Sequence, residues 1–193
     1  MKELREAIQM YGRGIGQDIV KVDMFLNHRI DTGLLFRMGE ELAKHFLPER
    51  PTMVLTVESS GIPLAVAAAH ALGDLPLVFA KKAEASNQSS GQMATAPVHS
   101  YTHNTDHMIR VDKRYIPIGS RVLIVDDFLA NGNAVRGLTQ IVEQLGAKVV
   151  GVGIGIEKGF QNGGEELRKA GIDLLSLAVV REICDGNIVL EDD

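Results

Sequence analysis

The chain has 193 residues, of which 45% are apolar and 23% are charged, and its formal net charge is -5. This length and composition are typical of one globular domain with a sizeable core, whereas the acidic balance argues against broad binding to nucleic acid or to an anionic membrane. The single cysteine, Cys184, excludes an intrachain disulfide. The sequence also lacks a signal-peptide core and an apolar run long enough to span a membrane, so we expect a cytoplasmic protein.

The first part of the chain predicts two amphipathic helices and one buried strand. Residues 2–11 read as a short helix, and the weak alternation of Asp18–Val22 suggests a short strand. Asp31 is a good N-cap for a helix that reaches about Phe46, because apolar side chains then recur at helical spacing. Met53–Val57 follows, with the apolar character of a buried strand in a parallel sheet.

The next part of the chain follows the order strand, small-residue turn, helix. Glu58-Ser59-Ser60-Gly61 follows the first buried strand, and Pro63 then lies in the first turn of the next helix, where proline is tolerated. Residues 77–80 form the next predicted strand, and Lys81 and Lys82 come directly after it.

A polar stretch from residue 83 to about residue 106 interrupts this pattern. It is rich in small residues, and a loop of this length inside a compact domain is usually a lid or a mobile segment. Val98–Thr102 fits one strand of a β-ribbon, and Met108–Val111 fits another short strand. We therefore expect a lid that includes some β-ribbon.

Arg121–Gly137, which reads RVLIVDDFLANGNAVRG, is the stretch around which the chain is organised. It begins as a branched apolar strand, which we expect to end at Asp126 and Asp127. The small residues of Ala130–Ala134 then lead into an amphipathic helix through Leu145, and the free N–H groups at a helix N-terminus favour an anion such as phosphate. Because two carboxylates would repel that phosphate, we expect them to face sugar hydroxyls or a divalent cation.

The remaining chain predicts a glycine-rich strand, a short helix and a last strand. In the strand Lys148–Ile156 the glycines share one face, so another element should pack closely there. Glu157 and Lys158 follow it, and a short helix over 163–170 and a strand over 174–180 complete the pattern. Strands that alternate with helices predict one α/β domain with a parallel sheet and right-handed crossovers.

Polar features follow four of these strands, at Glu58–Gly61, Lys81–Lys82, Asp126–Ala134 and Glu157–Lys158. In a parallel sheet the carboxyl ends of the strands meet at one edge, which is where open α/β sheets bind ligands. This convergence indicates a binding site more strongly than any one motif does.

The segment VLIVDDFLANGNA, at residues 122–134, resembles the phosphoribosyl pyrophosphate (PRPP) motif of the type I phosphoribosyltransferases. Together with it, KVDMFLNH at 21–28 and VESSGIPLA at 57–65 are similar to the bacterial xanthine phosphoribosyltransferases of that family. IEKGF at 156–160 also falls where the family has a counterpart. The resemblance covers nearly the whole chain.

This resemblance implies the type I phosphoribosyltransferase fold, with a mainly parallel central sheet flanked by helices, a small N-terminal hood and a flexible loop. It implies a single domain over residues 1–193, with about residues 1–35 as the base-binding hood, and a homodimer. The implied reaction is purine salvage, in which xanthine and PRPP give xanthosine 5′-monophosphate and pyrophosphate.

Two alternatives stay open. Guanine or hypoxanthine could be the preferred acceptor in place of xanthine. The chain could also be a non-catalytic regulator that binds a purine or PRPP on the same fold, although the segment before Asp31 is too short for a DNA-binding module with its linker.

Both the chemistry of PRPP and the resemblance assign its sugar ring and 5′-phosphate to residues of the central stretch. The 5′-phosphate would be bound by backbone N–H groups and asparagine side chains of a loop formed by Ala130, Asn131, Gly132, Asn133 and Ala134. Asp126 and Asp127 would accept hydrogen bonds from the 2′- and 3′-hydroxyls, directly or through Mg²⁺, and we expect both to act in catalysis.

The leaving pyrophosphate would be bound at the first strand end. The turn of Ser59, Ser60 and Gly61 offers N–H and hydroxyl donors to it. The transition state should resemble an oxocarbenium ion, which nearby carboxylates favour, while cationic groups favour the departing pyrophosphate. Lys81 is the candidate catalytic cation, and in related transferases a lysine near this position reaches into the neighbouring subunit's site.

Lys158 suggests the class of acceptor base. An ammonium group donates hydrogen bonds and cannot accept them, so it would bind a purine 6-oxo group and reject the exocyclic amine of adenine. By resemblance, Asn27 and the main chain near Val20 and Lys158 would read the rest of a xanthine base. Asn27 can donate to the 2-oxo group that distinguishes xanthine from hypoxanthine.

Ala130 departs from the pattern of the hypoxanthine–guanine relatives, which carry there an aspartate able to take the N7 proton. The base must therefore lose its proton to solution, through water or to another group. The histidines at 99, 103 and 107 do not converge on a metal at their spacing in a loop. The sequence thus identifies no certain metal ligand; Mg²⁺ is expected with PRPP, and whether it is required stays open.

Overall fold

The computed structural model describes residues 1–82, 92–100 and 105–191. The strands of its central sheet are β3 (Met53–Val57), β4 (Leu77–Ala80), β7 (Arg121–Leu129), β8 (Lys148–Lys158), β9 (Leu174–Cys184) and β10 (Asn187–Leu190). Their order across the sheet is β10-β9-β8-β7-β3-β4. Pairing is parallel from β4 to β9, and β10 runs antiparallel to β9. The predicted α/β fold with a mainly parallel sheet is confirmed.

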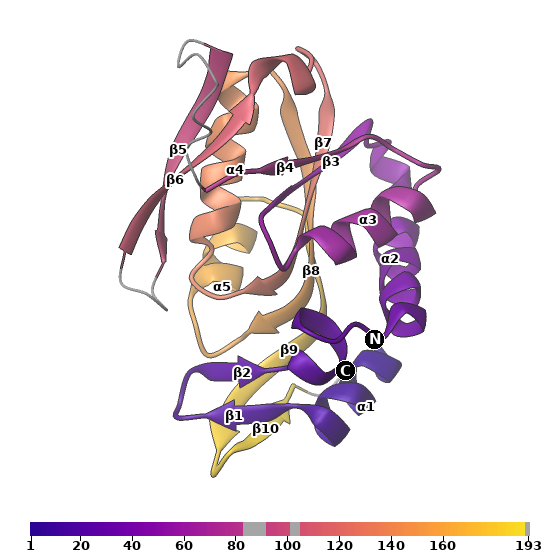
Figure 1. The fold of residues 1–193 in the computed structure, drawn as a ribbon, viewed down its shortest axis with the longest axis vertical. Helices are drawn as coiled ribbons and strands as arrows, with labels where there is room; N and C mark the ends of the chain where they lie inside the picture. Colours follow the sequence, from indigo (N-terminus) through magenta and orange to yellow (C-terminus); the bar gives the residue numbers. More distant parts are fainter. Residues whose placement is uncertain (83–91, 101–104, 192–193) are drawn as a thin grey trace.

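Helices cover both faces of this sheet (Figure 1). They are α1 (Lys2–Tyr11), α2 (Thr32–Phe46), α3 (Ile62–Ala71), α4 (Asn133–Gln144) and α5 (Gly163–Lys169). Buried apolar side chains form one cluster with α1, α2 and α3 and another with α4 and α5. None of the helices in the described part of the chain is long and apolar enough to cross a membrane.

The start and the packing of α2 follow two features of the sequence. The Asp31 carboxylate accepts a hydrogen bond from the Leu34 N–H at 3.0 Å and so caps the helix, as predicted. On β8, a Cβ atom added to Gly151 would overlap the ring of Phe46. The glycine face of β8 therefore allows the close packing that the spacing predicts.

The N-terminal segment forms a small hairpin beside the C-terminal strands (Figure 1). It consists of β1 (Arg13–Ile15) and β2 (Ile19–Lys21), and the π-helix η1 (Asp23–Asn27) follows. The N–H of Gly14 donates to the carbonyl oxygen of Gly186 at 2.9 Å, which joins this hairpin to the turn between β9 and β10. Neither β1 nor β10 was predicted, because both are short, β1 contains Gly14 and β10 directly follows Gly186.

A two-stranded ribbon packs on α4 (Figure 1). Its antiparallel strands are β5 (Met93–Ser100) and β6 (Thr105–Asp112), and the short 3-10 helix η4 (Lys113–Tyr115) follows. A Cβ atom on Gly137 of α4 would lie 2.6 Å from the side chain of Val98. Val98 lies in β5 and Met108–Val111 lies in β6, so the expected β-ribbon is confirmed where it is described, and both strands are longer than predicted. The predicted lid falls in part on residues 83–91 and 101–104, which lie outside the described residues.

β7 continues past the two acids at which we expected it to end. Asp126 pairs with Ile154 of β8 and Phe128 pairs with Ile156, so the ladder runs on to Leu129. The expected end of the strand is therefore wrong, because Ile154 and Ile156 of β8 supply backbone partners from the first acid onward, and Glu157 supplies the last. Both acids lie on a hydrogen-bonded strand, which fixes their position more firmly than a loop would.

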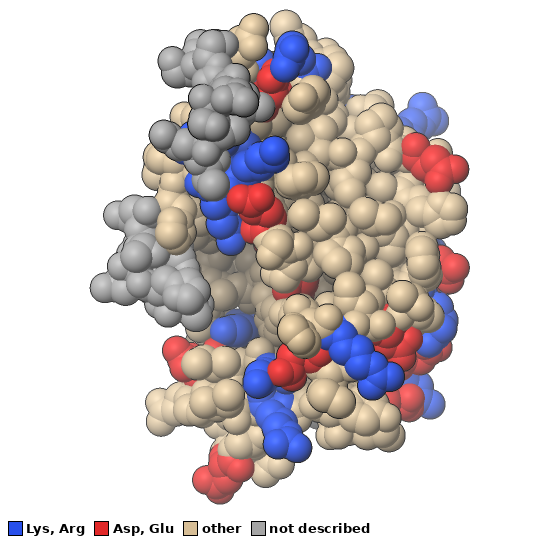
Figure 2. Space-filling view, in the orientation of Figure 1, with Lys and Arg blue, Asp and Glu red and all other residues tan. Residues whose placement is uncertain are grey.

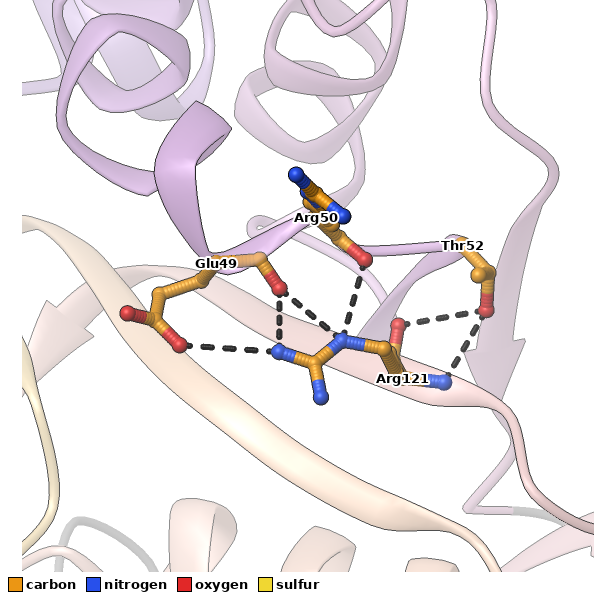
Figure 3. A network of polar contacts seen from close by, with 4 residues as sticks. All are labelled: Glu49, Arg50, Thr52 and Arg121. Carbon is orange, nitrogen blue, oxygen red and sulfur yellow. Dashed lines mark hydrogen bonds and ion pairs between the residues drawn. The ribbon is translucent and has the colours of Figure 1, made fainter.

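At the amino end of the sheet, Arg121 joins β7 to the 3-10 turn η2 (Leu47–Glu49) that precedes β3 (Figure 3). Arg121 Nε donates to the carbonyl oxygens of Glu49 and Arg50 at 2.9 and 3.2 Å, and Nη2 lies 3.5 Å from the Glu49 carboxylate. The N–H of Arg121 donates to Thr52 Oγ1 at 3.0 Å. These contacts fix the start of the strand whose other end carries the acids.

Candidate active site

The carboxyl ends of β3, β4, β7 and β8 surround a cleft of about 360 Å³. The predicted convergence of four strand ends is therefore confirmed. The β1–β2 hairpin and the β5–β6 ribbon add side chains to the cleft, so elements far apart in the sequence enclose it.

Asp126 and Asp127 both line this cleft, although only 6% and 4% of their surfaces are exposed. The Asp127 N–H donates to Asp126 Oδ1 at 3.0 Å, and Ser60 Oγ donates to Asp127 Oδ1 at 3.0 Å. Burial raises the pKa of Asp126 well above the usual value of an aspartate, and the negative charge of Asp127 raises it further. Two adjacent buried carboxylates are thus placed where hydroxyl donors or a cation would stabilise them.

The turn after β3 lies against the acids because Gly61 has no side chain. A Cβ atom on Gly61 would overlap Asp126 Oδ1 and would lie 2.5 Å from Thr56 Oγ1. Ser60 lines the cleft beside the acids, whereas Ser59 does not line it. Of the three residues predicted to bind pyrophosphate, Ser60 and Gly61 are therefore next to the acid pair.

Each residue of the predicted phosphate loop, Ala130–Ala134, lines the cleft. Gly132 is the N-cap of α4 and has a φ of 77°, in the left-handed region that favours glycine. Gly132 has no side chain that could cap this end of α4. The N–H groups of its first turn and the helix dipole therefore favour an anion in the cleft.

Lys158 also lines the cleft, at the end of β8. Its ammonium donates to the main-chain carbonyl oxygen of Asp18 at 2.6 Å. Burial lowers the pKa of Lys158, and the charge of Asp18 acts in the opposite direction. The ammonium is thus partly desolvated, held by the N-terminal hairpin, and near the polar groups of any ligand bound there.

The phosphoribosyl transferase domain matches residues 31–170 of this chain. The chain belongs to the phosphoribosyltransferase family. A curated xanthine phosphoribosyltransferase from Bifidobacterium longum subsp. infantis is 47% identical over 95% of this chain and 94% of its own length. Another, from Geobacillus thermodenitrificans, is 46% identical over 100% of this chain and 98% of its own length. The predicted family and the predicted likeness to the bacterial xanthine enzymes are both confirmed.

Solved structures of adenine phosphoribosyltransferases share this fold. The structure from Rhodothermus marinus has a TM-score of 0.73 and 24% identity over 93% of this chain and 100% of its own. The structure from Giardia lamblia has a TM-score of 0.74 and 21% identity over 91% of this chain and 96% of its own. At such identities the likeness concerns the fold, and it confirms the predicted type I phosphoribosyltransferase fold.

The structure of this phosphoribosyltransferase separates the residues predicted to bind the base. Lys158 lines the cleft, but Val20 is buried in the core and Asn27 is exposed on η1, and neither lines the cleft. Asp18 and Ile19 of the N-terminal hairpin line it instead. Adjacent side chains of a strand point to opposite sides. The weak alternation of Asp18–Val22 therefore could not show which of its residues face the cleft.

The two lysines after β4 also differ in position. Lys82 lines the cleft, whereas Lys81, the predicted catalytic cation, does not. The backbone N–H of Lys81 donates to the carbonyl oxygen of Arg110 at 3.0 Å, and this bridge to β6 fixes its place. The N–H of Lys82 donates to the Glu58 carboxylate at 2.6 Å. Of these two lysines, Lys82 is therefore the one that lines the cleft with the acids, and a role for Lys81 stays a prediction.

Glu157, which precedes Lys158 at the same strand end, has a structural role. Only 4% of its surface is exposed, and Arg168 of α5 donates two hydrogen bonds to its carboxylate, each at 2.7 Å. Burial alone would raise the pKa of Glu157, but hydrogen bonds from Arg168 and Ser176 outweigh it and lower that pKa. Glu157 therefore joins α5 to the sheet rather than reaching a ligand.

Other cleft residues gave no signal in the sequence, namely Phe128, His107 and Gln161. Phe128 was missed because we expected β7 to end before it, and His107 was missed because the strand that we expected there began at Met108. No group of three or more His, Cys, Asp or Glu side chains is placed for a metal in the described part of the chain. The acid pair alone still fits Mg²⁺, which is often held by one or two carboxylates together with substrate phosphates.

Proposed function

We propose that this phosphoribosyltransferase transfers the phosphoribosyl group of PRPP to xanthine, giving xanthosine 5′-monophosphate and pyrophosphate. The observation that supports the proposal is one cleft lined by the Ala130–Ala134 loop at a helix N-terminus, by the buried acid pair and by the ammonium of Lys158. The names of the relatives that match nearly the whole chain support xanthine as the acceptor.

The donor is assigned to the side of the cleft formed by β7 and β3. Ala130–Ala134 bind the 5′-phosphate through N–H groups, and Asp126 and Asp127 accept from the 2′- and 3′-hydroxyls. Their negative charge favours the positive charge that develops on the sugar as the bond from C1 to pyrophosphate breaks. Ser60 and Lys82 lie where they can donate to the departing pyrophosphate.

The acceptor is assigned to the side formed by β8 and the N-terminal hairpin, where about residues 1–35 act as a hood over the base. Lys158 donates to the 6-oxo group, and main-chain groups near Asp18 and Ile19 contact the ring. The base nitrogen attacks C1 of the sugar and loses a proton. With Ala130 at the position of the usual aspartate, that proton leaves through water, and the acidity of xanthine assists the step.

Mg²⁺ is assigned to the donor side of the cleft, where it would arrive with PRPP. The ion would supply positive charge that offsets the phosphates. Asp126 and Asp127 would hold it directly or through the sugar hydroxyls. We expect activity to fall when Mg²⁺ is chelated and to return when it is restored.

We also propose a cytoplasmic homodimer. Phe36 and Val66 are 44% and 47% exposed and line one shallow groove along α2 and α3, which a second copy could cover. Acidic and basic side chains are interspersed over the face shown in Figure 2, without a continuous basic patch. Light scattering after gel filtration would test the dimer: a mass of one chain at working concentrations would contradict it.

An assay across four bases tests the proposed function. The purified chain is incubated with PRPP, Mg²⁺ and either xanthine, guanine, hypoxanthine or adenine, and nucleotide and pyrophosphate are both quantified. We expect the highest kcat/KM with xanthine and equal amounts of the two products. Fastest turnover with guanine or hypoxanthine would reassign the base, and fastest turnover with adenine would contradict the role of Lys158. No nucleotide with any base would indicate a non-catalytic binder.

A further inference from the structure

Arg136, one turn into α4, binds two residues of the phosphate loop. Its Nη2 donates to Asn133 Oδ1 at 2.8 Å and also to the carbonyl oxygen of Asn131. Its Nη1 lies 3.1 Å from the Glu166 carboxylate on α5. One guanidinium thus links two residues of the loop to a second helix.

These hydrogen bonds engage two acceptor oxygens of the loop that would otherwise repel an anion. A phosphate is repelled by the lone pairs of a carbonyl oxygen or an amide oxygen, and it is attracted by N–H groups. Because a guanidinium only donates, Asn133 must turn its amide oxygen toward Arg136, and the other end of that amide is a donor. Arg136 therefore takes up two acceptors of the loop and fixes the orientation of the Asn133 side chain.

The neighbouring helix supports the loop at a second point. A Cβ atom on Gly163, the first residue of α5, would overlap the carbonyl oxygen of Ala130 and would lie 2.6 Å from the Gly132 nitrogen. The backbone of α5 thus lies directly against the loop, and Arg136 spans the same two elements. A loop fixed at two points has less conformational freedom to lose when the ligand binds.

We propose that Arg136 is a positioning residue for the 5′-phosphate of PRPP, acting through Asn131 and Asn133 rather than by touching the sugar. The proposal rests on the proposed function, because it assigns this loop to the 5′-phosphate. The ion pair with Glu166 is secondary: the two side chains are 41% and 56% exposed, and exposed pairs contribute little.

Calorimetric titrations with ribose 5-phosphate and, separately, with pyrophosphate test this role. The first probe requires the phosphate loop, and the second requires the turn after β3. We expect Arg136→Met to weaken ribose 5-phosphate binding about tenfold or more, because charged hydrogen bonds are lost, while pyrophosphate binding stays unchanged. In steady-state assays the KM for PRPP should rise much more than kcat falls.

Three further variants sharpen the test. Arg136→Lys keeps the charge but not the two-pronged geometry, so its affinity for ribose 5-phosphate should fall between those of wild type and Arg136→Met. It also carries the test if Arg136→Met does not fold. Glu166→Gln should weaken binding less than twofold. Arg181→Met removes an exposed arginine paired with Glu182 on β9 and should bind both probes as wild type does.

The outcomes separate the inference from the proposed function. If wild type binds ribose 5-phosphate and Arg136→Met and Arg136→Lys bind it equally well, Arg136 does not position the phosphate. Equal weakening of both probes would show a general structural defect and would also overturn the role. If wild type fails to bind ribose 5-phosphate, the proposed function is overturned, and this role with it.

Discussion

The two ends of β7 hold their polar groups in opposite ways. At the amino end, the Arg121 guanidinium donates to carbonyl oxygens of Glu49 and Arg50, and it faces a carboxylate of opposite charge (Figure 3). At the carboxyl end, Asp126 and Asp127 are buried side by side with like charge. Among the described residues, Ser60 Oγ donates to Asp127 and the Asp127 N–H donates to Asp126, and the pKa of Asp126 is raised by burial and by its neighbour.

This difference suggests that the polar groups at the amino end of β7 serve stability and that those at the carboxyl end serve function. An ion that is matched by protein partners needs no ligand, and its removal destabilises the fold. A buried pair of like charges opposes folding and is retained where a ligand supplies the missing partners. We therefore expect substitutions at the amino end to lower stability and substitutions at the carboxyl end to lower activity.

Replacing both acids should give the largest effect. In the Asp126→Asn, Asp127→Asn double variant the carboxylates that face the sugar are lost, and kcat/KM should fall about 10³-fold or more. The thermal midpoint should not fall, because two buried like charges are removed. Steady-state assays and circular dichroism measure both properties. A folded double variant with wild-type kcat/KM would show that the acids are only structural.

The pH dependence of stability should reveal Asp126 by itself. Because its pKa is higher in the folded chain than in the unfolded chain, the folded state holds more protons between those two values. Stability should therefore fall as pH rises through that window, by about 1.4 kcal/mol for each unit of pKa difference. Urea titrations should show this slope in wild type and a flatter one in Asp126→Asn. Equal slopes of stability against pH in wild type and Asp126→Asn would contradict the raised pKa of Asp126.

Removing the ammonium group of Lys158 should affect the oxopurine and not PRPP. Lys158→Met keeps much of the side-chain volume and loses the donor to the 6-oxo group, so kcat/KM for the oxopurine should fall about 10- to 100-fold. Affinity for PRPP in the absence of base should stay close to wild type, because the donor side is intact. Similar losses for both substrates would mean that Lys158 shapes the whole cleft.

The amino end should respond in stability alone. Arg121→Met removes donors to two carbonyl oxygens, and because the side chain is 38% exposed we expect a loss of only about 1 kcal/mol. The kcat/KM should match wild type. Lys148→Met, which replaces an exposed cation at the amino end of β8, serves as a control with no expected loss. A tenfold fall in kcat/KM for Arg121→Met would break the contrast between the two ends.

The sequence was most informative where the site is contiguous. The acids and the phosphate loop lie within one segment, so their types and spacing predicted their meeting without knowledge of the fold. Lys158 was predictable because it follows a strongly apolar strand. The sequence misjudged the end of β7, because an acid pair reads as the end of a strand when the partner strand is unknown.

Residues that depend on strand register were harder to predict. Lys82 rather than Lys81, and Asp18 and Ile19 rather than Val20, line the cleft. These choices differ by one or two residues, and one position changes the side on which a side chain lies. The bridge from Lys81 to Arg110 and the hairpin that carries Ile19 are set by tertiary contacts, which no local pattern encodes.

Titration of PRPP in the absence of base, with Mg²⁺ present, tests the central claim most directly, which is that the carboxyl end of β7 binds the donor and the amino end does not. Wild type and Arg121→Met should bind PRPP with equal affinity, and the Asp126→Asn, Asp127→Asn double variant should bind it at least about tenfold more weakly. Equal affinity for the double variant, or no binding by wild type, would contradict the claim.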